Sequence, residues 1–254
     1  MSSETLNGML EEFVRRCPYN SASALIEFNT HSFRQQMGGS CAQQLRILDH
    51  KLQEKEMQTR FLKARTSVHT VGVVTDANGE RFLIDPSKCM KEALSLDRLF
   101  SGREALTSPA FPQNERARRS VRLVPTGETT FKQEVVTASV KSQWQDDIKW
   151  ETFDLRDVTD DPPMGEIDCK VSLSGRSIQM VAVLPDGDVA TLRADDTSKI
   201  NMRLLAGEEE RDPDRRKAIF EAVATTCGVT RNELFRYLYH GQSLLQQMLK
   251  NAVI

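Results

Sequence analysis

Residues 68–85 place the tightest constraint on the fold, because they have the pattern of a β-hairpin. Two runs rich in β-branched and apolar residues, 68–75 and 81–85, flank a polar segment that contains Asn78-Gly79. A segment of this kind between two strand-like runs is a strong short-range signal for a hairpin. The sequence therefore predicts an antiparallel strand pair. In a three-residue loop, Gly79 would take the left-handed conformation.

The length of the turn decides which side chains of the hairpin share a face. A two-residue turn would leave His69 and Asp85 on opposite faces, because side chains alternate along a strand. A three-residue loop at 77–79 pairs Asp76 with Glu80. His69 is then a diagonal neighbour of Asp85 on the same face, within reach of a hydrogen bond. A contact between the imidazole and the carboxylate therefore requires the three-residue loop.

A cysteine precedes the hairpin in a setting that favours reactivity. The segment Gly38-Gly39-Ser40-Cys41 is followed by leucines at helical spacing, which predicts a helix over 41–55. Cys41 would lie in the first turn, where unpaired N–H groups and the helix dipole favour a thiolate. The two glycines would let the backbone approach a substrate carbonyl closely.

Cys41, His69 and Asp85 occur in this order, 28 and 16 positions apart. Taken singly, each has an ordinary explanation: a buried thiol, a strand histidine with a backbone partner, and a turn-opening aspartate. Together they supply a nucleophile, a base and a carboxylate that orients the base, so we favour a catalytic set. The backbone N–H of Cys41 is the main candidate for stabilising an oxyanion, and Gln35 and Gln36 are side-chain candidates.

The composition excludes several other classes of site and partner. A net charge of −2 over 254 residues gives no support for a nucleic-acid partner or an anionic membrane surface. No apolar run approaches the roughly 18 residues of a membrane span. Five scattered cysteines without a Cys-x-x-Cys pair disfavour both a disulfide framework and a metal site. The N-terminus lacks the layout of a secretory signal, so we expect a cytoplasmic protein.

The remaining elements follow from periodicity and punctuation. Helices are expected at 4–16, 213–227 and from 231 onward, with a helical or extended piece at 21–36 and a strand at 57–65. Short strands are expected at 120–124, 129–140, 148–155, 167–173, 177–184 and 188–194, which suggests an antiparallel sheet or barrel. Residues 86–120 have no clear period and are expected to be an irregular connector. Asp212-Pro213 and the pair Thr230 and Glu233 are helix-start signals.

The connector ends in a basic run of three arginines. Arg116, Arg118 and Arg119 could hold the phosphates of a cofactor, although a solvated charge run is the more ordinary explanation. No glycine-rich phosphate loop of a known pattern occurs.

The segment Gly38-Gly39-Ser40-Cys41, with His69 and Asp85, resembles the thiol site of arylamine N-acetyltransferases and transglutaminase-like proteins. Gln43 fits the acetyltransferase motif Arg-Gly-Gly-x-Cys-x-Glu/Gln-x-Asn, whereas Met37 and Leu45 depart from it. The Asp85-Pro86 pair is closer to transglutaminase-like proteins. The resemblance implies an α+β, papain-like fold of three parts. These are a helical part with the nucleophile at 1–66, an antiparallel β-barrel at 67–175, and a sheet-plus-helix lid at 176–254.

The resemblance also implies a function. The leading hypothesis is an acyltransferase that moves an acyl group from a small-molecule thioester, such as acetyl-CoA, through an acyl-cysteine to an amine acceptor. No tightly bound cofactor or metal is expected. A transglutaminase-like amidase or protease is the first alternative, and a catalytically silent binding module is the second. In the second alternative, the apolar stripe of the last helix would be the surface that binds a partner. The more ordinary explanation is that this stripe is part of the protein core. The stripe comprises Leu234, Phe235, Leu238, Leu244, Leu245 and Met248.

Overall fold

The computed structural model describes residues 3–31, 34–115, 117–139, 150–161, 177–195, 200–204 and 209–251. Their contacts divide the chain into two compact units. The first comprises Met1–Val14 and Gln44–Pro163, and the second comprises Arg15–Gln43 and Met164–Ile254. The N-terminal segment is thus shared between the two units. The expected strand at 167–173 and Arg116 lie outside the described residues.

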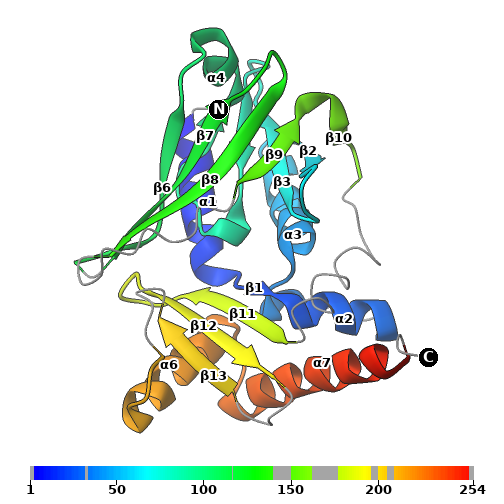
Figure 1. The fold of residues 1–254 in the computed structure, drawn as a ribbon, viewed down its shortest axis with the longest axis vertical. Helices are drawn as coiled ribbons and strands as arrows, with labels where there is room; N and C mark the ends of the chain where they lie inside the picture. The colour runs from blue at the N-terminus through cyan, green and yellow to red at the C-terminus, as the bar shows by residue number, and fades with distance from the viewer. Residues whose placement is uncertain are drawn as a thin grey trace. The chain divides into compact units, whose positions relative to one another are not determined.

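The first unit combines two antiparallel sheets with helix α4 and most of helices α1 and α3 (Figure 1). One sheet has the order β10-β2-β3-β4-β5, and the other has the order β6-β7-β8-β9. The helices are α1 (Ser3–Arg16), α3 (Cys41–Gln53) and α4 (Leu96–Gly102). The strands of the first sheet are β2 (Gln58–Lys63), β3 (Thr70–Thr75), β4 (Arg81–Ile84), β5 (Leu94–Ser95) and β10 (Val158–Thr159). Those of the second are β6 (Leu106–Gln113), β7 (Ala117–Pro125), β8 (Thr130–Ser139) and β9 (Glu151–Asp154).

Of the two hairpin loops that the sequence allows, the structure has the three-residue one. Thr75 pairs with Arg81 and Gly72 with Ile84, so strands β3 and β4 are joined by the three-residue loop. The N–H of Asp76 donates to the carbonyl of Glu80 at 3.0 Å, and Gly79 has a φ of 81°. The first strand is shorter than expected, because a hydrogen bond from the N–H of His69 to the Ser67 hydroxyl bends the chain ahead of it.

The irregular connector expected at 86–120 is wrong in its second half. After the short helix η2 (Pro86–Lys88) come β5, α4 and β6, and β6 pairs with β7 along most of its length. Prolines at 109 and 112 hid this strand in the sequence. Because β6 is the edge strand of its sheet, it can include residues without an N–H to donate, and its register shifts between Ala110 and Gln113.

The expected barrel is not seen in the described part of the chain. A barrel requires every strand to pair with two neighbours, whereas both sheets of the first unit are open. One sheet ends at β10 and β5, and the other ends at β6 and β9. The predicted strands at 120–124, 129–140 and 148–155 correspond to β7, β8 and β9. The antiparallel prediction is therefore confirmed, and closure is not.

The second unit is a four-stranded antiparallel sheet with helices against it (Figure 1). Its strand order is β1-β11-β12-β13, and helix α7 packs on β11 and β12 and alongside α2. The strands are β1 (Tyr19–Asn20), β11 (Ile178–Val183), β12 (Val189–Ala194) and β13 (Ile200–Leu204). The helical elements are α2 (Ser21–Thr30), η1 (Gln35–Met37), α6 (Pro213–Thr226) and α7 (Arg231–Asn251).

Both predicted starts of the C-terminal helices are confirmed. The Asp212 carboxylate accepts hydrogen bonds from the backbone at the start of α6, and Thr230 and Glu233 form a reciprocal capping box for α7. The apolar stripe of α7 belongs mainly to the core of this unit, since Leu234, Leu238 and Leu245 are fully buried. None of the helices in the described ranges is both long and apolar enough to cross a membrane.

Candidate functional site

A buried histidine–aspartate pair lies at one end of the hairpin. His69 directly precedes β3 and Asp85 directly follows β4, so the register of the hairpin brings them together. The Nε2 atom of His69 is 2.8 Å from Oδ2 of Asp85. Asp85 is fully buried and His69 is 8% exposed. A hydrogen bond between these groups fixes the orientation of the imidazole ring, with Nε2 toward the carboxylate.

The Asp85 carboxylate is held by donors on both of its oxygens. The Ser87 hydroxyl donates to Oδ1 at 2.8 Å, and the side-chain amide of Gln133 donates to Oδ2 at 2.7 Å. Burial acts to raise the pKa of Asp85, but the charge and hydrogen bond of His69 lower it. Lys88 and Ser87 lower it further, so the pKa of Asp85 lies well below its usual value. Asp85 is therefore ionised at neutral pH.

Two residues of this site were missed in the sequence. Gln133 reaches Asp85 from the middle of β8, and Glu151 at the start of β9 lies 3.6 Å from Nε2 of His69. Glu151 lies equally far from Nζ of Lys88 and accepts a hydrogen bond from the Ser67 hydroxyl at 3.0 Å. No local sequence pattern marks either residue, because both reach the site from strands distant in the sequence.

The loop that carries His69 is attached to β9 along its backbone. The N–H of Arg65 donates to the carbonyl of Thr152 at 2.8 Å, and the N–H of Thr152 donates to the Thr66 hydroxyl at 3.2 Å. The carbonyl of His69 itself accepts from the N–H of Ala64 at 2.8 Å. These bonds fix the backbone on the N-terminal side of His69.

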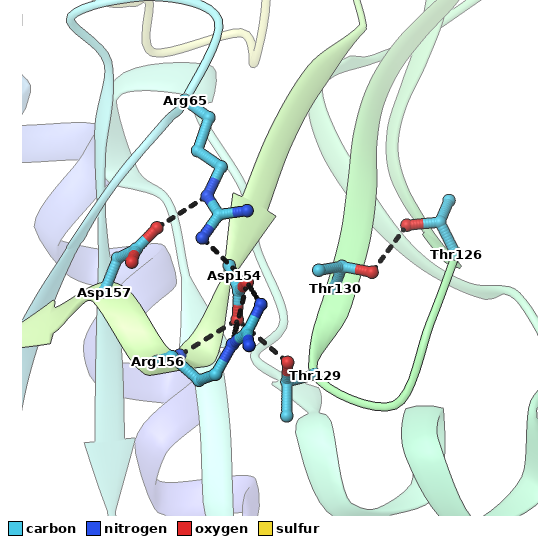
Figure 2. Close-up of polar contacts among 7 residues, drawn as sticks. All are labelled: Arg65, Thr126, Thr129, Thr130, Asp154, Arg156 and Asp157. Carbon is cyan, nitrogen blue, oxygen red and sulfur yellow. Dashed lines mark hydrogen bonds and ion pairs between the residues drawn. The ribbon is translucent and has the colours of Figure 1, made fainter.

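A charged cluster reinforces the same attachment (Figure 2). Arg65 forms ion pairs with Asp154 at 2.8 Å and with Asp157 at 2.7 Å, and Arg156 also pairs with Asp154. The Asp154 side chain is buried, and hydrogen bonds from Arg156 hold its pKa below the usual range. The Thr129 hydroxyl donates to the same carboxylate at 2.9 Å. The cluster thus joins the His69 loop, β9, the turn η3 (Leu155–Asp157) and the β7–β8 turn.

Cys41 occupies the first position of α3, within the second unit. Ser40 precedes it as the N-cap: its hydroxyl accepts from the N–H of Gln43 at 3.4 Å, while Oε1 of Gln43 accepts from the N–H of Ser40 at 2.9 Å. This reciprocal pair is a capping box. The amide of Gln43 also donates to the Glu27 carboxylate at 2.6 Å. Ser-Cys-Ala-Gln is thus a helix-start signal that fixes where Cys41 lies, and our sequence analysis did not use it.

The two glycines before Cys41 have a packing role. A Cβ atom on Gly38 would lie 1.9 Å from the carbonyl oxygen of Pro18, and its φ of 72° disfavours other residues. A Cβ atom on Gly39 would lie 2.5 Å from Cβ of Gln43. Gly39 also bonds through its backbone to Pro18 and Asn20. The two glycines therefore let the segment before Cys41 pack closely on Pro18 and Gln43.

The remaining predicted site residues lie on separate elements. Gln35 and Gln36 lie in η1 with exposed side chains, and neither side chain forms a hydrogen bond within the described ranges. The N–H of Cys41 lies in the first turn of a helix, where backbone donors have no intrahelical partner. Arg118 and Arg119 are neighbours on β7, so their side chains point to opposite faces.

Two other described thiols lie in settings that suppress reactivity. Cys89 and Cys227 are free thiols and, like Cys41, they are buried. Burial raises the pKa of Cys227 to about 12, and burial likewise raises the pKa of Cys89. Both thiols are thus protonated at neutral pH and are poor nucleophiles.

The Gln133 hydrogen bond predicts a loss of stability in a Gln133→Leu variant. A hydrogen bond to a charged group contributes about 1.5–3 kcal/mol, so we expect the free energy of unfolding to fall by about 2 kcal/mol. Urea denaturation measures the change, with Gln58→Leu as the control, because Gln58 is exposed on β2. Equal effects of the two substitutions would contradict a role of Gln133 in holding Asp85.

Comparisons with known proteins bear on the fold. The structure is similar to that of the arylamine N-acetyltransferase from Mycobacterium abscessus, with a TM-score of 0.51 and 12% sequence identity. The match covers 94% of this chain and 89% of that chain. No family model and no curated protein matches the sequence. The likeness therefore concerns the α+β fold alone, which agrees with the expected class.

Proposed function

We propose that this chain is a thiol-dependent acyltransferase with Cys41 as nucleophile, His69 as general base and Asp85 as the residue that orients the base. The carrying observation is the buried pair of His69 and an ionised Asp85, joined at 2.8 Å through Nε2. With Nε2 engaged, Nδ1 is the atom of the ring that would exchange a proton with the thiol. The fold similarity to an N-acetyltransferase supports the same class of reaction.

The packing of α3 supports Cys41 as the nucleophile. Within the first unit, a Cβ atom on Gly72 of β3 would lie 2.9 Å from a methyl group of Leu45. Leu45, which lies one helical turn after Cys41 in α3, thus touches β3, the strand that follows His69. The capping box places Cys41 in the first turn of α3, where backbone N–H groups without an intrahelical partner can face a developing oxyanion.

The proposed reaction has two acyl transfers. His69 takes the proton of Cys41, and the thiolate attacks the carbonyl carbon of an acyl thioester, such as acetyl-CoA. The C–S bond of the donor breaks, and the departing thiolate takes the proton from His69. An amine then attacks the acyl-cysteine, loses a proton to His69 and releases the Cys41 thiolate, which recovers that proton. The N–H of Cys41 would stabilise the oxyanion in each step.

A single-turnover acylation tests this proposal. The protein is mixed with acetyl-CoA and, separately, with a longer acyl thioester, and its intact mass is followed over time. We expect a mass increase of one acyl group on the wild type and on Cys89→Ser, and none on Cys41→Ala. An amine added afterwards should remove the adduct. No adduct from any thioester, or an adduct that survives in Cys41→Ala, would refute the proposal.

A hydrolytic alternative is favoured by one feature, the Asp85-Pro86 sequence that resembles transglutaminase-like proteins. An amidase or protease with the same residues would release ammonia or peptide fragments without consuming a thioester. Iodoacetamide labelling distinguishes both enzymes from a catalytically silent binding module. In an enzyme, Cys41 should be alkylated much faster than Cys89 and Cys227, which burial keeps protonated. Equal rates for the three thiols would favour the binding module.

A further inference from the structure

The second unit contains a cavity that none of the proposed chemistry uses. Its volume is about 740 Å³, within the roughly 300–1,000 Å³ of small-molecule sites. Strand β13 and helices α6 and α7 supply its walls. The lining side chains are Ile200, Asn201, Met202, Glu209, Arg216, Lys217, Phe220, Arg231, Asn232 and Phe235. Cys41, His69 and Asp85 are not among them.

One part of the wall is apolar and rigid. Ile200, Met202 and Phe220 are almost completely buried, so they form a fixed floor. Phe235 is 46% exposed, but its ring packs on Tyr239 at a centroid distance of 4.4 Å, which limits its movement. A preformed apolar surface of this kind binds hydrophobic groups without a large ordering cost.

The polar part of the wall is mainly cationic. Arg216, Lys217 and Arg231 line it, against one acidic residue, Glu209. Arg216 donates to the neutral carbonyl of Ile200 at 2.8 Å, and in the described ranges neither it nor Lys217 forms an ion pair. Arg231 forms an ion pair at 3.6 Å with Glu221, which does not line the cavity. Both side chains are exposed, so this pair contributes little. Among the described lining residues, three cationic side chains therefore lie beside the apolar floor with a single acidic one.

We propose that this cavity binds a small molecule that joins an apolar, preferably aromatic, group to one anionic group. The apolar part packs on Phe220 and Phe235, and the carboxylate, sulfonate or phosphate faces Lys217 and Arg231. Charge selects against neutral ligands of the same shape, because the cationic groups gain an ionic partner only from an anion. The proposal does not depend on the acyltransferase activity.

A pair of fluorescent probes tests both requirements on the full chain. 8-Anilino-1-naphthalenesulfonate has two aromatic groups and a sulfonate, and N-phenyl-1-naphthylamine has the same aromatic groups without the charge. We expect saturable 1:1 binding of the sulfonate at low ionic strength and weaker binding of the neutral probe. In Lys217→Gln/Arg231→Gln, the Kd of the sulfonate should rise roughly tenfold, and that of the neutral probe less than twofold. Phe235→Ser should weaken both probes.

The control is the other exposed large aromatic residue of the described chain. Trp150 is 42% exposed and has Nζ of Lys132 5.5 Å from its ring centre, so it also combines an aromatic surface with a cation. Trp150→Ser should leave both affinities within twofold, and so should alkylation of Cys41. Near-ultraviolet circular dichroism confirms native packing, because the sulfonate also binds loosely packed states. Equal affinity for the two probes, or a sulfonate affinity that Trp150→Ser abolishes and the cavity variants leave unchanged, would overturn the proposal.

Discussion

Replacing Asp85 by asparagine is expected to slow acylation of Cys41 by about 10⁴-fold, as loss of the orienting carboxylate does in other triads of this kind. The carboxylate accepts a hydrogen bond from Nε2–H of His69 and stabilises the imidazolium. An amide NH₂ in its place would donate to Nε2 and favour the tautomer whose Nδ1 carries the proton. That tautomer cannot take a proton from the thiol. The rate is measured by intact mass in a single turnover with the thioester.

Glu151→Gln is the matched control for this substitution. It also converts a carboxylate near Nε2 of His69 into an amide, but at 3.6 Å instead of 2.8 Å and on a more exposed residue. We expect a less than tenfold loss of rate, because a longer and partly solvated ion pair contributes at most about 1 kcal/mol. A loss as large as that of Asp85→Asn would show that both carboxylates, and not Asp85 alone, hold the base.

Asp85→Asn should also change how stability depends on pH, whether or not the chain is an acyltransferase. The pKa of Asp85 is lower in the folded state than in the unfolded state. Its contribution to the free energy of unfolding is therefore fully present above the unfolded pKa of about 4 and is lost as the pH falls below that value. Breaking the buried pair should cost about 3 kcal/mol at pH 7. Urea denaturation should show this difference shrinking as the pH falls below about 4. A difference that stays constant would contradict an ionised, bonded Asp85.

Gly38→Ala is expected to destabilise the protein by more than about 3 kcal/mol. The backbone of Gly38, with φ 72° and ψ −165°, lies in a region that is essentially restricted to glycine. The added methyl group would lie 1.9 Å from the carbonyl oxygen of Pro18, and backbone atoms cannot move aside cheaply. Because Gly38 leads into the turn before Cys41, acylation should be lost along with stability. Thermal unfolding and intact-mass acylation measure the two effects.

Two other glycines separate the clash from the conformational strain. Gly79 has a φ of 81° but nothing within 4 Å of an added Cβ, so Gly79→Ala should cost only about 1–2 kcal/mol. Gly8 lies inside α1 with open space around it and no positive φ, so Gly8→Ala should stabilise by about 0.5–1 kcal/mol. The expected order of stability is therefore Gly8→Ala, wild type, Gly79→Ala, Gly38→Ala. Gly38→Ala no worse than Gly79→Ala would rule out the contact with Pro18 as the cause.

Features defined by a short segment were predictable from the sequence. The capping box at Thr230 and Glu233 and the N-cap at Asp212 were predicted correctly, because donor and acceptor lie within three residues. The hairpin was also predictable from its two strand-like runs, but the sequence left open whether its loop has two or three residues. Strand β6 was missed, since its prolines suit only an edge strand, and edge position depends on the whole sheet.

For the candidate site, the sequence by itself determined that one hairpin carries both His69 and Asp85, and the three-residue loop of the structure then sets their distance. Only the tertiary structure decided what surrounds them. Gln133 is 48 positions from Asp85, and Glu151 reaches His69 from β9, and neither has a local pattern that marks it. The tertiary structure also decided that position 38 packs against the backbone of Pro18, where only glycine fits. The physical reason is the same in each case: contacts between distant segments depend on how the sheets and loops pack, which no local periodicity encodes.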